Sequence, residues 1–117
     1  MIDVAIIGAG PSGTIAAMLL AKAGWTVEIV DRETFPRFSI GESLLPQAMT
    51  WLDEAGVLQD VVEAGFQYKN GAAFRWGEAE EVFDFRDKSS EGWGTTYQVR
   101  RDRFDLLLAE AAQRKGI

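Results

Sequence analysis

The sequence contains no cysteine and no histidine. Without cysteine the chain forms no disulfide, and it lacks both a thiolate nucleophile and the redox-active cysteine pair of disulfide-type flavoenzymes. Without histidine it cannot build a Ser-His-Asp triad, and a zinc site would have to consist of carboxylates alone. Proton chemistry within this chain therefore depends on Asp, Glu, Lys, Tyr or a cofactor, and we expect no metal site.

Basic side chains are also few, with 12 against 18 acidic ones and a formal net charge of −6. Because they form no long block, we expect neither a nucleic-acid surface nor a polybasic membrane patch. The uncharged run over residues 4–21 reaches the length of a membrane-spanning helix, but three glycines and a proline interrupt it. With 47% apolar residues the chain can bury a core, and we expect a soluble cytoplasmic domain without a membrane span.

The first 30 residues have the pattern of a βαβ unit. Residues 2–7 form an apolar run rich in β-branched side chains, typical of a central parallel strand covered on both faces. Apolar residues recur at helical spacing over 12–23, and a second strand is expected over 26–30. The sequence therefore predicts an α/β, Rossmann-like FAD/NAD(P)-binding domain with a right-handed crossover.

Further elements follow this unit. Helices are predicted over 46–55, 58–64 and 102–115, strands over 67–76, 81–85 and 95–99, and a loop over 87–94. The last helix has an apolar stripe at i, i+3, i+4 and i+7 spacing, formed by Phe104, Leu107, Leu108 and Ala111. Aromatic residues alternate along two of these strands, so each pair should share one face of an added hairpin that turns near Gly77. These aromatics are Phe74, Trp76, Phe83 and Phe85.

The stretch IIGAGPSG places Gly8, Gly10 and Gly13 in a G-x-G-x-x-G pattern between strand and helix. The first glycine permits the tight turn, the second lets a pyrophosphate approach bare backbone, and the third brings helix against strand. The helix that begins with Pro11 and Ser12 adds free N–H groups from Ser12 onward, together with a positive dipole end. The sequence therefore predicts a dinucleotide site, without separating FAD from NAD.

The second strand ends at Asp31 and Arg32, which we include in the candidate site. Asp31 lies close to the expected spacing of about 20 residues for an acid that accepts from ribose hydroxyls. The stretch FPRFSIGESLLPQ follows, at the carboxyl edge of the sheet, where Arg37 can pair with phosphate and the backbone at Ile40 and Gly41 can approach a planar ring. The alternative is an ordinary surface loop in which a serine starts the next helix.

Four motifs extend over nearly the whole chain: GAGPSG, FPRFSIGESLLP, YKNGAAFRWG and YQVRRDRFDLLL. In this combination the sequence resembles the N-terminal portion of flavin-dependent halogenases and their relatives among flavin hydroxylases and geranylgeranyl reductases. The resemblance implies FAD as the cofactor. It also implies that residues 1–117 are the N-terminal part of one FAD-binding domain, incomplete at its C-terminus.

The resemblance also implies roles for single residues. Residues 33–41 match a strap that touches the flavin and links its site to the substrate site. Arg101 matches an arginine placed against FAD, and Gln98 is a second candidate for that neighbourhood. Lys69 matches the lysine that halogenases place between flavin and substrate, where an ammonium donates to hypohalous acid or an amine is halogenated. The alternative for Lys69 is a strand lysine that points to water.

In the enzymes that the chain resembles, reduced FAD and oxygen convert a halide into hypohalous acid, while the protein binds and orients the cofactor. The leading hypothesis is the FAD-binding portion of a halogenase-like oxidoreductase acting on a small molecule, aromatic or carrier-bound, with a flavin reductase as partner. Two alternatives stay open. One is an FAD-dependent monooxygenase or geranylgeranyl reductase-like enzyme without halide chemistry, and the other is a non-catalytic nucleotide-binding fragment.

Overall fold

The computed structural model describes residues 1–117 and contains four helices and six strands. In chain order these are β1 (Val4–Ile7), α1 (Pro11–Lys22), β2 (Val27–Val30), α2 (Pro46–Glu54), α3 (Leu58–Glu63), β3 (Gln67–Lys69), β4 (Gly71–Trp76), β5 (Ala79–Asp84), β6 (Thr96–Gln98) and α4 (Arg101–Arg114). Apart from one strand that divides in two, their bounds lie within two residues of the predicted ones. The α/β, Rossmann-like fold class is thus confirmed.

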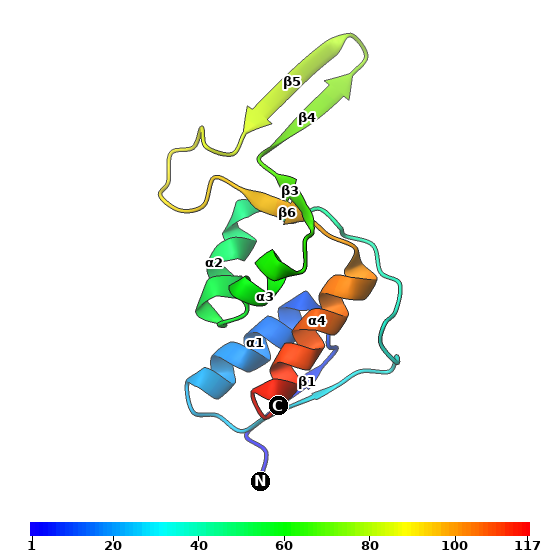
Figure 1. Ribbon diagram of the computed structural model, residues 1–117, viewed down its shortest axis with the longest axis vertical. Coiled ribbons are helices and arrows are strands. Elements are labelled where there is room, and N and C mark those ends of the chain that lie inside the picture. Colours follow the sequence, from blue (N-terminus) through cyan, green and yellow to red (C-terminus); the bar gives the residue numbers. More distant parts are fainter.

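The βαβ unit pairs β1 and β2 in parallel, from Val4 opposite Val27 to Ile7 opposite Val30. Helix α1 packs on one face of both strands, and α4 lies beside α1 (Figure 1). The other face is open, since Ile7 is 90% and Val30 48% exposed. The prediction of a strand covered on both faces is wrong for this chain, because its helices cover only one face.

The core lies among the four helices. Its largest fully buried apolar side chains are Met18, Leu52, Val57, Val61, Phe104 and Leu108. On α4 the predicted apolar stripe faces this core, and Phe66 meets the Phe104 ring edge-on with centroids 5.8 Å apart. The core therefore holds α4 firmly, and with it the residues at its first turn.

None of the helices is long and apolar enough to cross a membrane.

The strand predicted over 67–76 divides at Asn70 into two strands that join different sheets. Strand β3 pairs antiparallel with β6, whereas β4 pairs with β5 in a hairpin whose turn includes Gly77, with φ +61°. Phe74 of β4 and Phe83 of β5 pack edge-on with ring centroids 5.7 Å apart, so these two aromatics lie on the same face of the hairpin. The division at Asn70 lets the hairpin leave the body while β3 stays on it.

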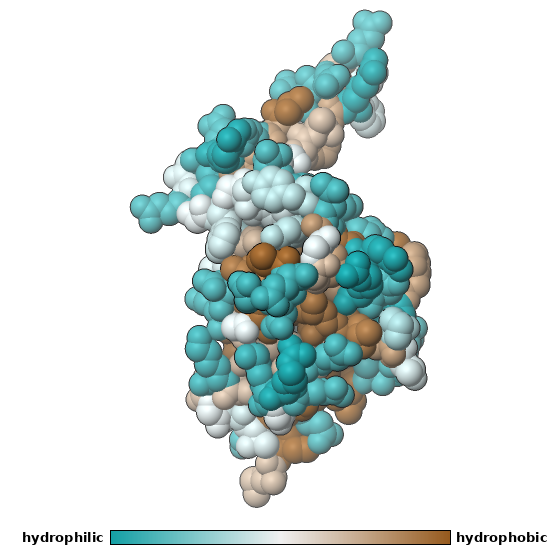
Figure 2. Space-filling view, viewed as in Figure 1, coloured by the Kyte–Doolittle hydropathy of each residue, from teal (hydrophilic) through white to brown (hydrophobic).

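The hairpin projects from the body of the molecule (Figure 1). The radius of gyration is 16.0 Å, against about 13 Å for a compact domain of this size. Apolar groups lie among polar ones on this arm and on the body (Figure 2), and on the hairpin Phe74 is 62% and Trp76 88% exposed. The hairpin thus contributes little to the core.

The strap, residues 33–41, runs along one side of the molecule from the end of β2 toward β6 (Figure 1). Just beyond the strap, Leu44 donates its N–H to the Tyr97 carbonyl at 3.1 Å, and Val99 donates to the Glu42 carbonyl at 2.7 Å. Ser43 forms an isolated antiparallel bridge with Gln98. The chain after the strap therefore forms a third row beside β6 and β3.

Candidate functional site

In the glycine turn between β1 and α1, the fold requires glycine at positions 8 and 13 but not at position 10. Gly8 has φ +104°, which L side chains rarely adopt. A Cβ on Gly13 would lie 2.0 Å from the Gly8 carbonyl oxygen. A Cβ on Gly10, where φ is −72°, would meet nothing nearer than a guanidinium nitrogen of Arg37 at 3.7 Å. The fold tolerates a side chain at Gly10, so its bare backbone suits an incoming ligand.

Helix α1 begins directly after this turn, with Gly10 as its N-cap and Pro11 in its first turn, and no side chain caps it. The first N–H groups of a helix have no intrahelical acceptor, and the helix dipole adds partial positive charge at the same end. Ser12 is exposed there. The turn and the helix start therefore fit an anionic group such as a diphosphate.

Two arginines from distant parts of the chain meet at this turn. Arg37 comes from the strap and Arg101 from the first turn of α4, and a Cβ on Gly10 would lie 3.7 and 3.9 Å from their Nη2 atoms. Both bind Asp105, which is 1% exposed: Arg37 Nη1 lies 2.5 Å from Oδ2, and Arg101 Nε lies 2.8 Å from Oδ1. The arginines are thus positioned beside bare backbone, where both can face an anion.

Asp105 is the site residue that sequence reasoning missed. A buried carboxylate is tolerated only when it is paired and hydrogen-bonded, and Arg101 satisfies this with a second contact of 3.0 Å from Nη2 to Oδ2. The hydrogen bond to Asp105 also raises the pKa of Arg101 above its ordinary value. The available signal was an acidic residue four positions after Arg101, next to Phe104 on the core-facing side of the helix.

The backbone of the strap contacts Arg101. Arg101 Nη1 donates to the Ile40 carbonyl at 2.6 Å. Gly41 has φ +103°, and a Cβ there would lie 2.9 Å from Arg101 Nη1. The side chains of Ile40 and Phe38 are 75% and 82% exposed. The structure therefore brings Gly10, Arg37, Arg101 and the strap backbone together.

Asp31 lies at the end of β2 and binds the glycine turn. Its Oδ2 accepts from the Ala9 N–H at 2.8 Å and its Oδ1 from the Glu33 N–H at 2.9 Å. These backbone hydrogen bonds, that of Ala9 first, lower the pKa of Asp31. The carboxylate therefore fixes the turn relative to β2.

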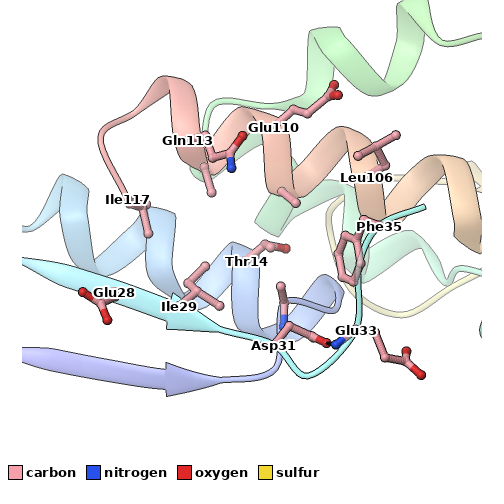
Figure 3. A pocket seen from close by; sticks show the side chains of 13 residues that line it. Thr14, Glu28, Ile29, Asp31, Glu33, Phe35, Leu106, Glu110, Gln113 and Ile117 are labelled. Atoms are coloured by element: carbon pink, nitrogen blue, oxygen red, sulfur yellow. Dashed lines mark hydrogen bonds between the residues drawn. The ribbon is translucent and has the colours of Figure 1, made fainter. Parts of the chain in front are cut away.

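A cavity of 520 Å³ adjoins Asp31 between β2 and α4, with Phe35 beside it and Gln113 of α4 farther along (Figure 3). Arg32 borders a separate depression of 450 Å³ together with Gly8 and Arg37. Both Asp31 and Arg32 are exposed. Asp31 thus lies where a group bound on the glycine turn and a group in the cavity would meet.

Lys69 lies elsewhere, in a cavity of 390 Å³ that contains none of the glycine-turn residues. Its Nζ donates to the Ser43 hydroxyl and, at 3.2 Å, to the Leu44 carbonyl, and it lies 5.3 Å from the centre of the Phe85 ring. The side chain is therefore held by protein groups, in contrast to a strand lysine that simply points to water. Gln98 is exposed and pairs through its backbone with Gln67.

Comparisons with known proteins show the family to which the chain belongs. The FAD binding domain family matches residues 1–117. A solved flavoprotein/dehydrogenase from Cytophaga hutchinsonii is 52% identical, with a TM-score of 0.93 over 99% of this chain and 29% of that one.

Two halogenating relatives are similar over almost the whole chain. Tryptophan 2-halogenase of Chondromyces crocatus is 38% identical over 112 residues, which are 96% of this chain and 21% of that protein. The 1H-pyrrole-2-carbonyl peptidyl-carrier protein chlorinase of Pseudomonas fluorescens is 34% identical over 132 residues, 97% of this chain and 29% of that protein. The chain thus spans less than a third of these relatives. The two matches confirm the predicted resemblance to the N-terminal portion of flavin-dependent halogenases. Because the family match extends over every residue, the chain belongs to the FAD binding domain family and takes FAD as its cofactor.

Proposed function

We propose that residues 1–117 are the N-terminal part of the FAD-binding domain of a flavin-dependent halogenase-like oxidoreductase. The observation that carries this proposal is the position of Lys69, held in a cavity of its own and separate from the arginine-flanked glycine turn. The strap and the residues that follow it connect the two places. This arrangement fits an enzyme in which the cofactor and the organic substrate occupy different chambers.

The glycine turn and the start of α1 would hold the diphosphate of FAD, with Arg37 and Arg101 beside it. Asp31 would accept from the ribose, since each of its oxygens keeps a lone pair beyond its backbone hydrogen bond. The backbone at Ile40 and Gly41 would face the flavin ring. Arg32 borders the depression that Gly8 and Arg37 line, and Gln98 lies exposed on β6, opposite Ser43. FAD supplies the redox and oxygen chemistry, and the chain binds and orients it.

Lys69 would act on the halogenating species. An ammonium has three donors, and the Ser43 hydroxyl and the Leu44 carbonyl take two of them. The third donor is left for an oxygen of hypohalous acid. The side chain is partly buried, so water competes less for this donor than at an exposed lysine.

The substrate is a small organic molecule in this proposal, either aromatic or bound to a carrier protein. The pyrrole chlorinase and the tryptophan halogenase, by their names, act on these two kinds of substrate. A separate flavin reductase would supply reduced FAD. Since such a reductase draws on intracellular nicotinamide cofactors, we place the protein in the cytoplasm.

The test uses the complete protein with reduced FAD, oxygen and an electron-rich phenol or indole as probe, with and without bromide or chloride. We expect a halogenated product that appears only with halide and is lost in Lys69→Ala while FAD binding persists. Lys115→Ala, at the far end of α4, is the matched control and should behave as the parent protein. Turnover of the probe without halide would contradict the proposal.

The second candidate is an FAD-dependent hydroxylase or reductase without halide chemistry. The 52% identity to a flavoprotein/dehydrogenase favours it. This candidate predicts product formation that is indifferent to halide. If the complete protein carries no FAD after purification and takes up none, this result would instead favour the third alternative, in which residues 1–117 are a non-catalytic nucleotide-binding part of the protein.

A further inference from the structure

Ser43 makes a contact that none of the assigned roles explains. Its hydroxyl accepts a hydrogen bond from Lys69 Nζ, although the two residues are 26 positions apart. The helix-capping role open to this serine is absent, because the N-cap of α2 is Leu45 and no side chain caps that helix. The hydroxyl therefore serves Lys69.

The backbone on both sides of this contact is fixed. Ser43 bridges Gln98 of β6, and its neighbour Leu44 donates to the Tyr97 carbonyl at 3.1 Å. On the other edge of β6, Lys69 lies opposite Thr96 in the ladder with β3. Lys69 thus reaches across β6 to the row that contains Ser43. The tip of the Lys69 side chain therefore lies at the far row, where it meets the Ser43 hydroxyl and the Leu44 carbonyl.

The contact also joins the two chambers. Ser43 lies two residues after Gly41, whose backbone is next to Arg101 Nη1 and belongs to the strap. Movement of the strap would therefore reach Lys69 through Ser43 and Leu44. Because the Leu44 contact uses a backbone carbonyl, Ser43 is the only side chain in this pair of acceptors that substitution can remove.

Resting on the proposed halogenase function, we propose that Ser43 is a positioning residue for Lys69: it holds the ammonium toward the cavity and ties it to the strap. A hydrogen bond from a charged donor is stronger than one between neutral groups. Ser43→Ala removes this acceptor and leaves Lys69 Nζ with the Leu44 carbonyl and the Phe85 ring. Ser43→Thr keeps the hydroxyl.

The first experiment measures the position of Lys69 without any turnover. The complete protein is treated briefly with acetic anhydride, and the acetylation rate of Lys69 is measured by mass spectrometry relative to Lys115. We expect the relative rate to rise several-fold in Ser43→Ala and to stay at the parent value in Ser43→Thr. Ser89→Ala, an exposed serine in the loop before β6, is the matched control and should change nothing. An unchanged rate in Ser43→Ala overturns the proposal.

The second experiment measures halogenated product per reduced flavin consumed, with the phenol or indole probe and bromide. We expect Ser43→Ala to lose about tenfold, as for one charge-assisted hydrogen bond, with unchanged FAD affinity and unchanged rate of flavin oxidation. Ser43→Thr should restore most of the yield. Parent-like yield in Ser43→Ala, where Lys69→Ala is inactive, overturns the positioning role. If the parent protein itself gives no halide-dependent product, the proposed function fails. The acetylation experiment still tests the contact between Ser43 and Lys69 in that case, because it requires no turnover.

Discussion

Asp105 connects the strap to α4, and removing its charge shows how far the site depends on that connection. The carboxylate is 1% exposed, and the side chains of its partners Arg37 and Arg101 are 15% and 13% exposed. Asp105→Asn keeps the volume, but it leaves one acceptor oxygen and turns an amide donor toward two guanidinium groups. Breaking a buried pair in this way costs about 3–5 kcal/mol.

The assay is amide hydrogen exchange on the FAD-free complete protein. The Val99 N–H, bonded to the Glu42 carbonyl at 2.7 Å, reports opening of the segment that follows the strap. If Asp105 holds this segment, a loss of about 3–5 kcal/mol of local opening free energy accelerates exchange about a hundredfold or more. The affinity for FAD should fall as well, since both arginines lose their position beside the glycine turn.

Asp102→Asn is the control, on the same helix. Asp102 pairs with Arg100 at 2.6 Å, but Arg100 is 72% exposed, and surface pairs contribute little. Asp102→Asn should therefore leave exchange at Val99 and FAD binding close to the parent values. Equal exchange rates in the Asp105 and Asp102 variants would refute the role assigned to the buried carboxylate.

Two further substitutions test the turn itself. Gly13→Ala places a Cβ 2.0 Å from the Gly8 carbonyl oxygen, so it should lower the melting temperature sharply or abolish soluble expression; a parent-like melting curve would contradict this. Asp31→Asn should lower the melting temperature at pH 7, because the carboxylate accepts from the Ala9 and Glu33 N–H groups and its folded-state pKa is lowered from 3.8. The stabilisation by ionised Asp31 is present above the unfolded-state pKa and disappears as the pH falls through the folded-state pKa of Asp31. The difference in melting temperature between variant and parent should therefore shrink below about pH 4. A difference that is constant from pH 7 to pH 3 would argue against it.

Most of the fold could be predicted from local sequence patterns. The βαβ unit, the three later helices and the hairpin follow from apolar spacing and turn residues within short windows, and α4 buries Phe104 and Leu108 as its stripe predicts. The division at Asn70 was not accessible in this way, because both halves have strand composition and only their partners differ. Coverage of the sheet on one face likewise depends on which helices the chain supplies.

The site was predictable in part. Spacing alone indicated the glycine turn and Asp31, and the resemblance to flavin enzymes supplied Arg101 and Lys69. The contact of Arg37 with Asp105 joins residues 68 positions apart, and that of Ser43 with Lys69 joins residues 26 apart. Such contacts depend on tertiary packing, which no local pattern encodes.

The measurement that tests the central claim most directly is FAD titration of the Gly10→Ala variant of the complete protein. The new methyl group would have no neighbour nearer than 3.7 Å and an ordinary backbone angle, so the melting temperature should equal that of the parent. The methyl group would occupy the space of the diphosphate between the helix start and the two arginines. We predict that FAD affinity falls at least about tenfold, a loss of about 1.4 kcal/mol or more. Unchanged FAD affinity in a folded Gly10→Ala variant would contradict the account.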